Sequence, residues 1–155
     1  MIAGWAAGIL RVVQREQTID RAKAAAAGLF LSAGVLAAYA FGSRIAGRAR
    51  PDSDLDVGYY LLGYRRRDRL PLEAELRLSG ELSEAIGLEV DMRNLAEAPL
   101  ELRGLVLVNG VRIFSGDDVA RVELERELLA RYHDYREEFR QMHELRLRRM
   151  AESGF

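Results

Sequence analysis

The sequence contains no cysteine and only two histidines, His133 and His143. The lack of cysteine excludes disulfides, thiolate zinc sites, iron–sulfur clusters and a cysteine nucleophile, and two histidines are too few for a three-histidine metal site. Any metal chemistry must therefore rest on carboxylates. Both histidines lie in a charged helical pattern, and we interpret them as surface residues. Lysine is nearly missing as well, because Lys23 is the only one, and we assign no function to the resulting dominance of arginine.

An excess of charge of one sign is also absent. Lys and Arg number 23 and Asp and Glu 24, which gives a formal net charge of −1. Such a chain has no global attraction to nucleic acid or anionic membranes, so any such contact must come from a local patch, and we expect no direct nucleic-acid binding. A length of 155 residues with 49% hydrophobic residues is typical of one globular domain. We expect a single domain over residues 1–155, with a core at about 19–116 and a C-terminal helix at about 117–150.

One uncharged stretch, from Ala24 to Ser43, is long enough to span a membrane. It is rich in alanine and is interrupted by Gly28 and Gly34, which favours a buried helix followed by a buried strand. The extreme N-terminus lacks the basic region of a secretory signal. We therefore expect a cytoplasmic protein that does not associate with a membrane.

Hydrophobic periodicity predicts an α+β fold in which helices flank a small mixed β-sheet of about four strands. We expect helices at 4–15, from a cap at Thr18 to about 31, at 71–86 with Gly87 as C-cap, at 99–109 and at 117–150. We expect strands at 35–41, 54–62, 88–94 and 111–114.

Three segments allow two interpretations each. The pair Asn109-Gly110 ends a helix that Pro99 begins, or forms the turn of a hairpin. The apolar stripe within residues 121–150 packs on the sheet or binds a partner. The basic cluster at 65–69 is a solvated loop or contacts an acidic partner or RNA. We favour the first interpretation in each case.

The segment from Gly42 to Asp56 carries the chemistry. Asp54 and Asp56 are two residues apart on a predicted strand, so both carboxylates leave the same face. Neighbouring carboxylates repel each other, and a hard divalent cation such as Mg²⁺ removes that conflict. Asp91, on the polar face of the next predicted strand, is a candidate third carboxylate.

Gly42 and Ser43 end a predicted strand, and ten residues separate Ser43 from Asp54. A glycine there lets the backbone approach a phosphate, and the serine hydroxyl and nearby N–H groups donate to it. Arg44, Arg48 and Arg50 follow and are able to neutralise triphosphate charge. An isolated Asp-x-Asp pair is usually solvated and an isolated Gly-Ser is an ordinary turn, but their combination with a later strand aspartate favours a nucleotide site.

Gly42-Ser43, ten residues and then Asp54-x-Asp56 resembles the signature of the DNA polymerase β-like nucleotidyltransferases. The chain is most similar to the minimal nucleotidyltransferase branch, the MntA-like antitoxins of HEPN/MNT (type VII) toxin–antitoxin modules. The segments that carry this likeness, within residues 35–116, are Tyr39–Ser43, Arg50–Asp56, Glu89–Asp91, Ala98–Leu100 and Val108–Gly110. Ala46 departs from the family, whose members often carry arginine before the position of Gly47.

The resemblance implies a role for each of these residues. Asp54, Asp56 and Asp91 would form a catalytic triad holding Mg²⁺, with two ions expected, and Asp91 would serve as general base. Gly42, Ser43 and Arg44 would bind the ATP phosphates. The family's reaction transfers AMP from ATP to a tyrosine of a partner HEPN ribonuclease encoded by a neighbouring gene, which silences that toxin.

Two other functions stay open. The chain is an antitoxin that neutralises its partner by direct complex formation without catalysis, or it transfers nucleotides to a small molecule. The second alternative requires a larger helical domain for the acceptor than the residues after Phe114 provide.

Overall fold

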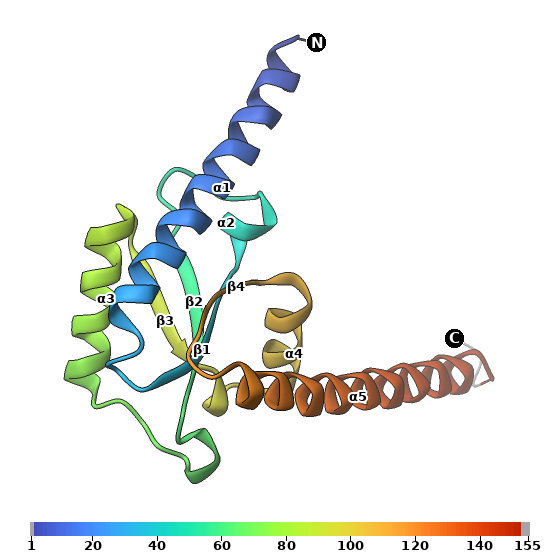
Figure 1. Cartoon of the computed structure of the whole chain (residues 1–155). Coiled ribbons are helices and arrows are strands. Elements are labelled where there is room, and N and C mark those ends of the chain that lie inside the picture. Colours follow the sequence, from blue (N-terminus) through green and yellow to red (C-terminus); the bar gives the residue numbers. More distant parts are fainter. Residues whose placement is uncertain (1, 153–155) are drawn as a thin grey trace.

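The computed structural model describes residues 2–152 as one four-stranded sheet with helices on both faces (Figure 1). The elements in chain order are α1 (Ile2–Leu29), β1 (Val35–Phe41), α2 (Ser43–Ala46), β2 (Leu55–Leu61), η1 (Tyr64–Arg66), α3 (Leu72–Ile86), β3 (Val90–Asn94), η2 (Leu95–Glu97), α4 (Leu100–Asn109), β4 (Val111–Ser115) and α5 (Asp118–Glu152). The predicted α+β class, the mixed sheet and the long C-terminal helix are confirmed.

The strands lie in the order β3-β2-β1-β4. β1 pairs antiparallel with both β2 and β4, whereas β2 and β3 run parallel. The end of β1 and the beginnings of β2 and β3 therefore meet at one edge of the sheet. Three segments that are distant in sequence come together there.

Alternation along the strands divides the core into two layers. One layer contains Val57, Tyr59 and Leu82 and lies under α1 and α3. The other contains Tyr39 and Tyr60 and lies under α4 and α5. At the end of the sheet where β1 ends, Leu55 and Val90 belong to the first layer, whereas Asp56 is half-buried and Asp91 is exposed.

A single long α1 replaces the two predicted N-terminal helices. Thr18 does not cap a helix, because its hydroxyl donates to the Gln14 carbonyl one turn earlier at 2.9 Å. No glycine or proline interrupts residues 9–27, so the helical hydrogen bonds continue through the predicted break. The prediction of a boundary near residue 16 was wrong.

The uncharged stretch from Ala24 to Ser43 forms the end of α1 and the buried strand β1, as predicted. Ala26 and Phe30 are buried against the sheet. Of the helices in residues 2–152, none combines the length and the hydropathy that crossing a bilayer requires.

Most predicted boundaries agree with the structure to within two residues. Gly87 caps α3 in the left-handed conformation with φ 80°, as predicted. Asn109-Gly110 separates helix α4 from strand β4, so the hairpin alternative was wrong. β2 begins at Leu55 and β3 at Val90, so the predicted starts at 54 and 88 were too early. Asp54 therefore lies directly before the strand rather than in it.

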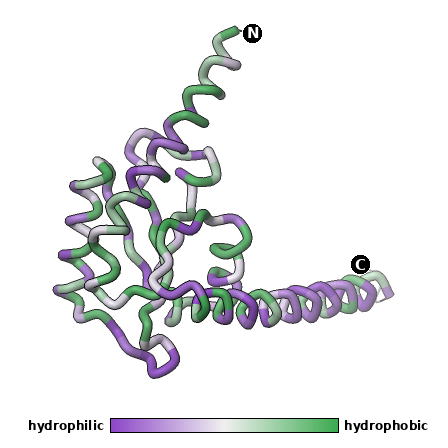
Figure 2. The backbone as a smooth tube through the Cα atoms, in the orientation of Figure 1, coloured by the Kyte–Doolittle hydropathy of each residue, from purple (hydrophilic) through white to green (hydrophobic). Residues whose placement is uncertain are grey.

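α5 divides into a packed half and an exposed half. Leu124, Leu128 and Tyr132 are buried against the sheet and α4, whereas Phe139 and Met142 are 62% and 70% exposed. Figure 2 shows the outer half projecting away from the domain, and most of its residues are coloured as hydrophilic. Packing on the sheet was the right prediction for the inner half only.

A buried arginine joins α5 to the sheet. Arg121 is 8% exposed, donates to Ser115 Oγ at 3.0 Å and forms an ion pair with Glu125 at 2.9 Å. Glu125 in turn accepts a hydrogen bond from the Tyr39 hydroxyl at 2.8 Å. Burial and this carboxylate raise the pKa of Tyr39 well above its ordinary value. The network fixes the direction in which α5 leaves the domain.

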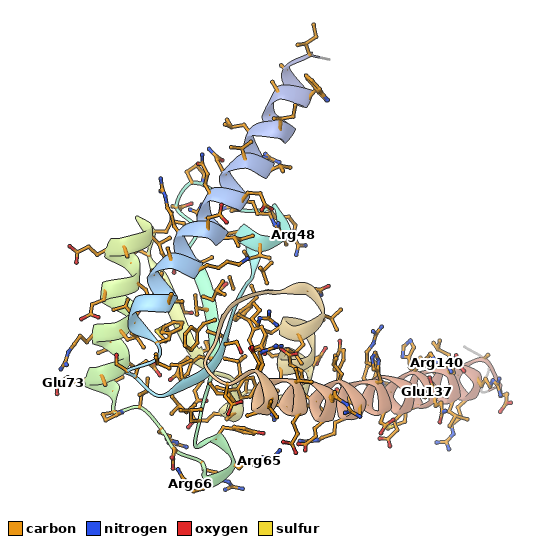
Figure 3. All side chains as sticks on the ribbon, in the orientation of Figure 1. Arg48, Arg65, Arg66, Glu73, Glu137 and Arg140 are labelled. Atoms are coloured by element: carbon orange, nitrogen blue, oxygen red, sulfur yellow. The ribbon has the colours of Figure 1, made fainter. Side chains whose placement is uncertain are left out.

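The basic cluster at 65–69 is exposed, and one of its arginines contacts α5. Arg65 donates to Glu127 at 3.1 Å, while Arg66 pairs with Asp68 beside it (Figure 3). Arg69 forms an ion pair with Glu97. These exposed pairs contribute little to stability, and they show a solvated loop that pairs with itself and with α5 and η2.

Gly104 should be the least replaceable helical glycine. A Cβ there would overlap the Tyr132 ring, where α4 packs on α5, whereas a Cβ on Gly80 of α3 meets open space. We expect Gly104→Ala to lower the free energy of unfolding by about 1–3 kcal/mol through overpacking. The matched control Gly80→Ala should raise it by about 0.5–1 kcal/mol through helix propensity. Urea unfolding followed by circular dichroism measures both, and equal effects would contradict the close packing of these helices.

Candidate active site

Strand register brings the sequence-predicted residues to one place. Phe41 pairs with Asp56 across β1 and β2, and Asp56 pairs with Asp91 across β2 and β3. Paired positions point to the same face of a sheet, so both carboxylates lie on the face that α4 and α5 pack against, in a part that these helices do not cover. Gly42 and Ser43 follow Phe41 directly and lie beside Asp56.

Gly42 approaches Asp56 so closely that a side chain there would not fit. Its φ is 85°, in the region that favours glycine, and an added Cβ would overlap the Asp56 Oδ2 atom. The Gly42 carbonyl accepts from Ala46 N at 3.0 Å, which begins the short helix α2. The Ser43 hydroxyl forms no hydrogen bond within residues 2–152, so it is free to donate to a ligand.

Asp56 is a half-buried carboxylate without a hydrogen-bond donor among the described residues. Burial is the main cause that raises its pKa above the ordinary value, and the negative charges of Asp91 and Asp54 raise it further. The guanidinium of Arg93 acts in the opposite direction. The site thus concentrates negative charge at its centre.

Asp54 and Asp91 are more exposed than Asp56. Asp91 Oδ2 lies 3.6 Å from Arg93 Nε, so its charge is partly balanced within the chain. Throughout residues 2–152, no three or more acidic or histidine side chains are gathered closely enough to enclose a metal ion. The structure brings Asp56 and Asp91 together and leaves Asp54 at their margin.

Arg93 belongs to the site although the sequence analysis gave it no role. It lies two residues after Asp91 on β3, on the same face, and pairs in register with Gly58. The alternating pattern already placed Arg93 with Asp91 on the polar side of the strand. Only the pairing of β3 with β2 shows that this face is shared with Asp56.

Arg44 has a structural role in addition to any contact with a nucleotide. Its guanidinium donates to the Ser53 carbonyl at 2.7 Å and to the Pro51 carbonyl at 3.1 Å. These bonds close the loop between α2 and β2, which fixes the position of Asp54. Arg48 and Arg50 are exposed, and Figure 3 shows Arg48 pointing outward beside α2.

The carboxylates suit a hard divalent cation. Mg²⁺ prefers oxygen ligands and binds through one or two carboxylates, with water and phosphates completing its shell. Asp56 and Asp91 supply such oxygens on one face, and mutual repulsion at Asp56 is the conflict that a cation would relieve. The oxygen donors of Asp56 and Asp91 therefore fit this ion.

Comparison with solved structures shows a similar fold. A toxin–antitoxin complex with AMP-PNP aligns with a TM-score of 0.52 at 18% identity, covering 76% of this chain and 87% of that chain. An MNT antitoxin complex with the tri-AMPylated HEPN toxin of Shewanella oneidensis aligns with a TM-score of 0.52 at 16% identity, covering 88% of this chain and 98% of that chain. No curated protein sequence gives a significant match.

A family model places the chain more directly. The model of the polymerase beta nucleotidyltransferase domain matches residues 29–119, more than half of the chain. The matched range contains β1 to β4 and all the carboxylates described above. The chain therefore belongs to the polymerase beta nucleotidyltransferase family.

Proposed function

We propose that this nucleotidyltransferase uses Mg²⁺ to transfer AMP from ATP to a tyrosine hydroxyl of a HEPN toxin, and that it acts as the antitoxin of that toxin. The observation that carries the proposal is the register that sets Asp56 opposite Asp91, with Gly42 and Ser43 alongside. Similarity to toxin–antitoxin complexes, one of which contains an AMPylated HEPN toxin, supports the choice of acceptor.

In this proposal each residue has one task. Gly42 leaves room for the β- and γ-phosphates, and the Ser43 hydroxyl donates to them. Asp54, Asp56 and Asp91 hold the metal, which supplies charge stabilisation to the triphosphate and the attacking oxygen. Asp91 accepts the proton of the acceptor hydroxyl. The acceptor oxygen then bonds to the α-phosphorus while the bond from that phosphorus to the pyrophosphate oxygen breaks.

A second candidate function, neutralisation by complex formation alone, is favoured by the outer half of α5. Tyr135 and Phe139 stack with ring centroids 6.3 Å apart, and Met142 lies exposed one turn further. Exposed aromatic and methionine side chains are typical of protein interfaces.

The central experiment is a labelled transfer reaction. The protein, Mg²⁺ and the product of the neighbouring gene are incubated with ATP labelled at the α- or the γ-phosphate. We expect label on the partner from α-labelled ATP only, and at least a hundredfold loss of transfer in Asp54→Asn/Asp56→Asn, because positioning of charge supplies most of the catalysis.

The outcomes distinguish the candidates. Label from γ-labelled ATP would indicate phosphorylation and contradict the proposal. A stable complex without label, with undiminished neutralisation by the aspartate variant, would support the binding function. Transfer to a small molecule in an acceptor screen would support the third alternative.

Asp56→Asn should also stabilise the fold at neutral pH. The folded-state pKa of Asp56 is raised, so the folded protein binds this proton more tightly than the unfolded chain does, and the ionised carboxylate destabilises the fold above its pKa. We expect a higher urea midpoint for the variant at neutral pH, and a difference that vanishes as the pH falls to about 4.

The control is Asp52→Asn, which removes an exposed carboxylate of the same loop that has no hydrogen bond or ion pair among residues 2–152. It should not change the urea midpoint. Added Mg²⁺ should stabilise the wild type more than Asp56→Asn, and equal stabilisation of both would exclude Asp56 as a ligand.

Phe139→Glu should weaken the complex with the toxin partner by about 2 kcal/mol, as expected for an aromatic interface residue. Leu76→Glu on α3 is the control, because Leu76 is 63% exposed, close to the 62% of Phe139, and lies on the opposite side of the sheet. Calorimetric titration measures both affinities. Equal loss in the two variants would contradict a partner contact on α5.

A further inference from the structure

A hollow of about 550 Å³ lies outside the carboxylate site, between the middle of α1, the segment after α2 and the end of α3. Figure 1 shows the segment joining α2 to β2 passing beside the middle of α1. Residues 47–51 form one wall and residues 86–88 another. The hollow thus shares its loop with the site but opens on the α1 side of the sheet.

The lining of this hollow is strongly basic. It includes five arginines and no aspartate or glutamate, although the whole chain has a formal net charge of −1. The arginines are Arg11, Arg15, Arg21, Arg44 and Arg50. A chain whose charges nearly balance attracts a polyanion only through a local positive patch, and this lining is such a patch.

The arginines divide into held and free side chains. Arg15 donates to the Ile45 carbonyl at 2.9 Å, and Arg44 is held by the loop carbonyls. Arg11, Arg21 and Arg50 form no side-chain hydrogen bond or ion pair within residues 2–152. Two guanidinium groups therefore stiffen the walls, and three are available to a ligand.

The free groups are spread over a distance that suits a chain of phosphates. Arg11 and Arg21 are ten residues apart on one helix, which corresponds to about 15 Å. Gln14 lies between them and also lines the hollow, and its side-chain amide adds a hydrogen-bond donor to the row. The Thr18 hydroxyl, which lines the hollow too, already donates to the Gln14 carbonyl. A single phosphate is too small to contact both ends, whereas several successive phosphates of one nucleic-acid strand reach along the row.

We propose that the arginine-lined hollow between α1, residues 47–51 and the end of α3 binds the phosphate chain of a nucleic-acid strand. Guanidinium groups bind phosphate oxygens in pairs, and contacts to phosphates carry no sequence information, so binding is independent of base sequence. The bond from Arg15 to Ile45 connects this hollow to α2, which begins at Ser43 of the carboxylate site. The proposal does not depend on the transfer reaction.

The test measures binding of the full chain to a short labelled single-stranded RNA by fluorescence anisotropy over a series of salt concentrations. Arg11→Gln/Arg21→Gln should weaken binding roughly tenfold and lower the slope of log affinity against log salt by about 1.4, about 0.7 for each lost phosphate contact. Both side chains are exposed and unpaired, so the variant should keep the wild-type thermal midpoint.

The matched control is Arg146→Gln/Arg148→Gln, which removes the same charge from the exposed outer half of α5 and should leave affinity and slope unchanged. Equal losses in both variants, or no binding of RNA by the wild type, would overturn the proposal.

Two competitors identify the source of the phosphates. Inorganic tripolyphosphate that displaces RNA at equal concentration would assign the same hollow to a free polyphosphate. Polyglutamate that binds as tightly as RNA, with the same dependence on Arg11 and Arg21, would indicate an acidic protein segment and overturn the assignment to phosphate.

Discussion

The repulsion between carboxylates at one edge of the sheet is the constraint on which the site depends. Backbone register, rather than side-chain attraction, sets Asp56 opposite Asp91, and the hydrogen bonds of β2 with β1 and β3 hold them there. Burial raises the pKa of Asp56, and no hydrogen-bond donor among the described residues offsets that effect. Such an arrangement lowers stability, as is common at functional sites, and a divalent cation would relieve the repulsion.

The surrounding structure makes that edge rigid. Arg44 closes the loop before Asp54, the two hydrophobic layers anchor β1 and β2, and Arg121 with Glu125 ties α5 to Tyr39. Each of these contacts lies beside the carboxylates rather than among them. Such support keeps the oxygens in place during a reaction that needs positioning and charge stabilisation more than covalent chemistry.

Two helices extend beyond what the sheet can cover. The first half of α1 exposes Trp5 and Ile9, and the outer half of α5 exposes Phe139 and Met142. Figure 1 shows both arms leaving the body of the domain, with α2 and α4 between them. The exposed apolar surfaces and the small carboxylate site therefore occupy different parts of one short chain.

The sequence by itself determined the elements and the candidate residues, because local periodicity, proline and glycine positions and the Gly-Ser and Asp-x-Asp spacing are properties of short segments. It placed Gly42 at a strand end, Asp56 and Asp91 on strands, and Gly87 at a helix end. It failed where the outcome depends on distant contacts. Thr18 lies inside a helix, Arg44 binds loop carbonyls, Arg93 joins the site, and only half of α5 finds a surface to cover. Strand order and register decide the place of Arg93, and contacts between other distant segments decide how much of α5 is covered. No local pattern specifies such pairing.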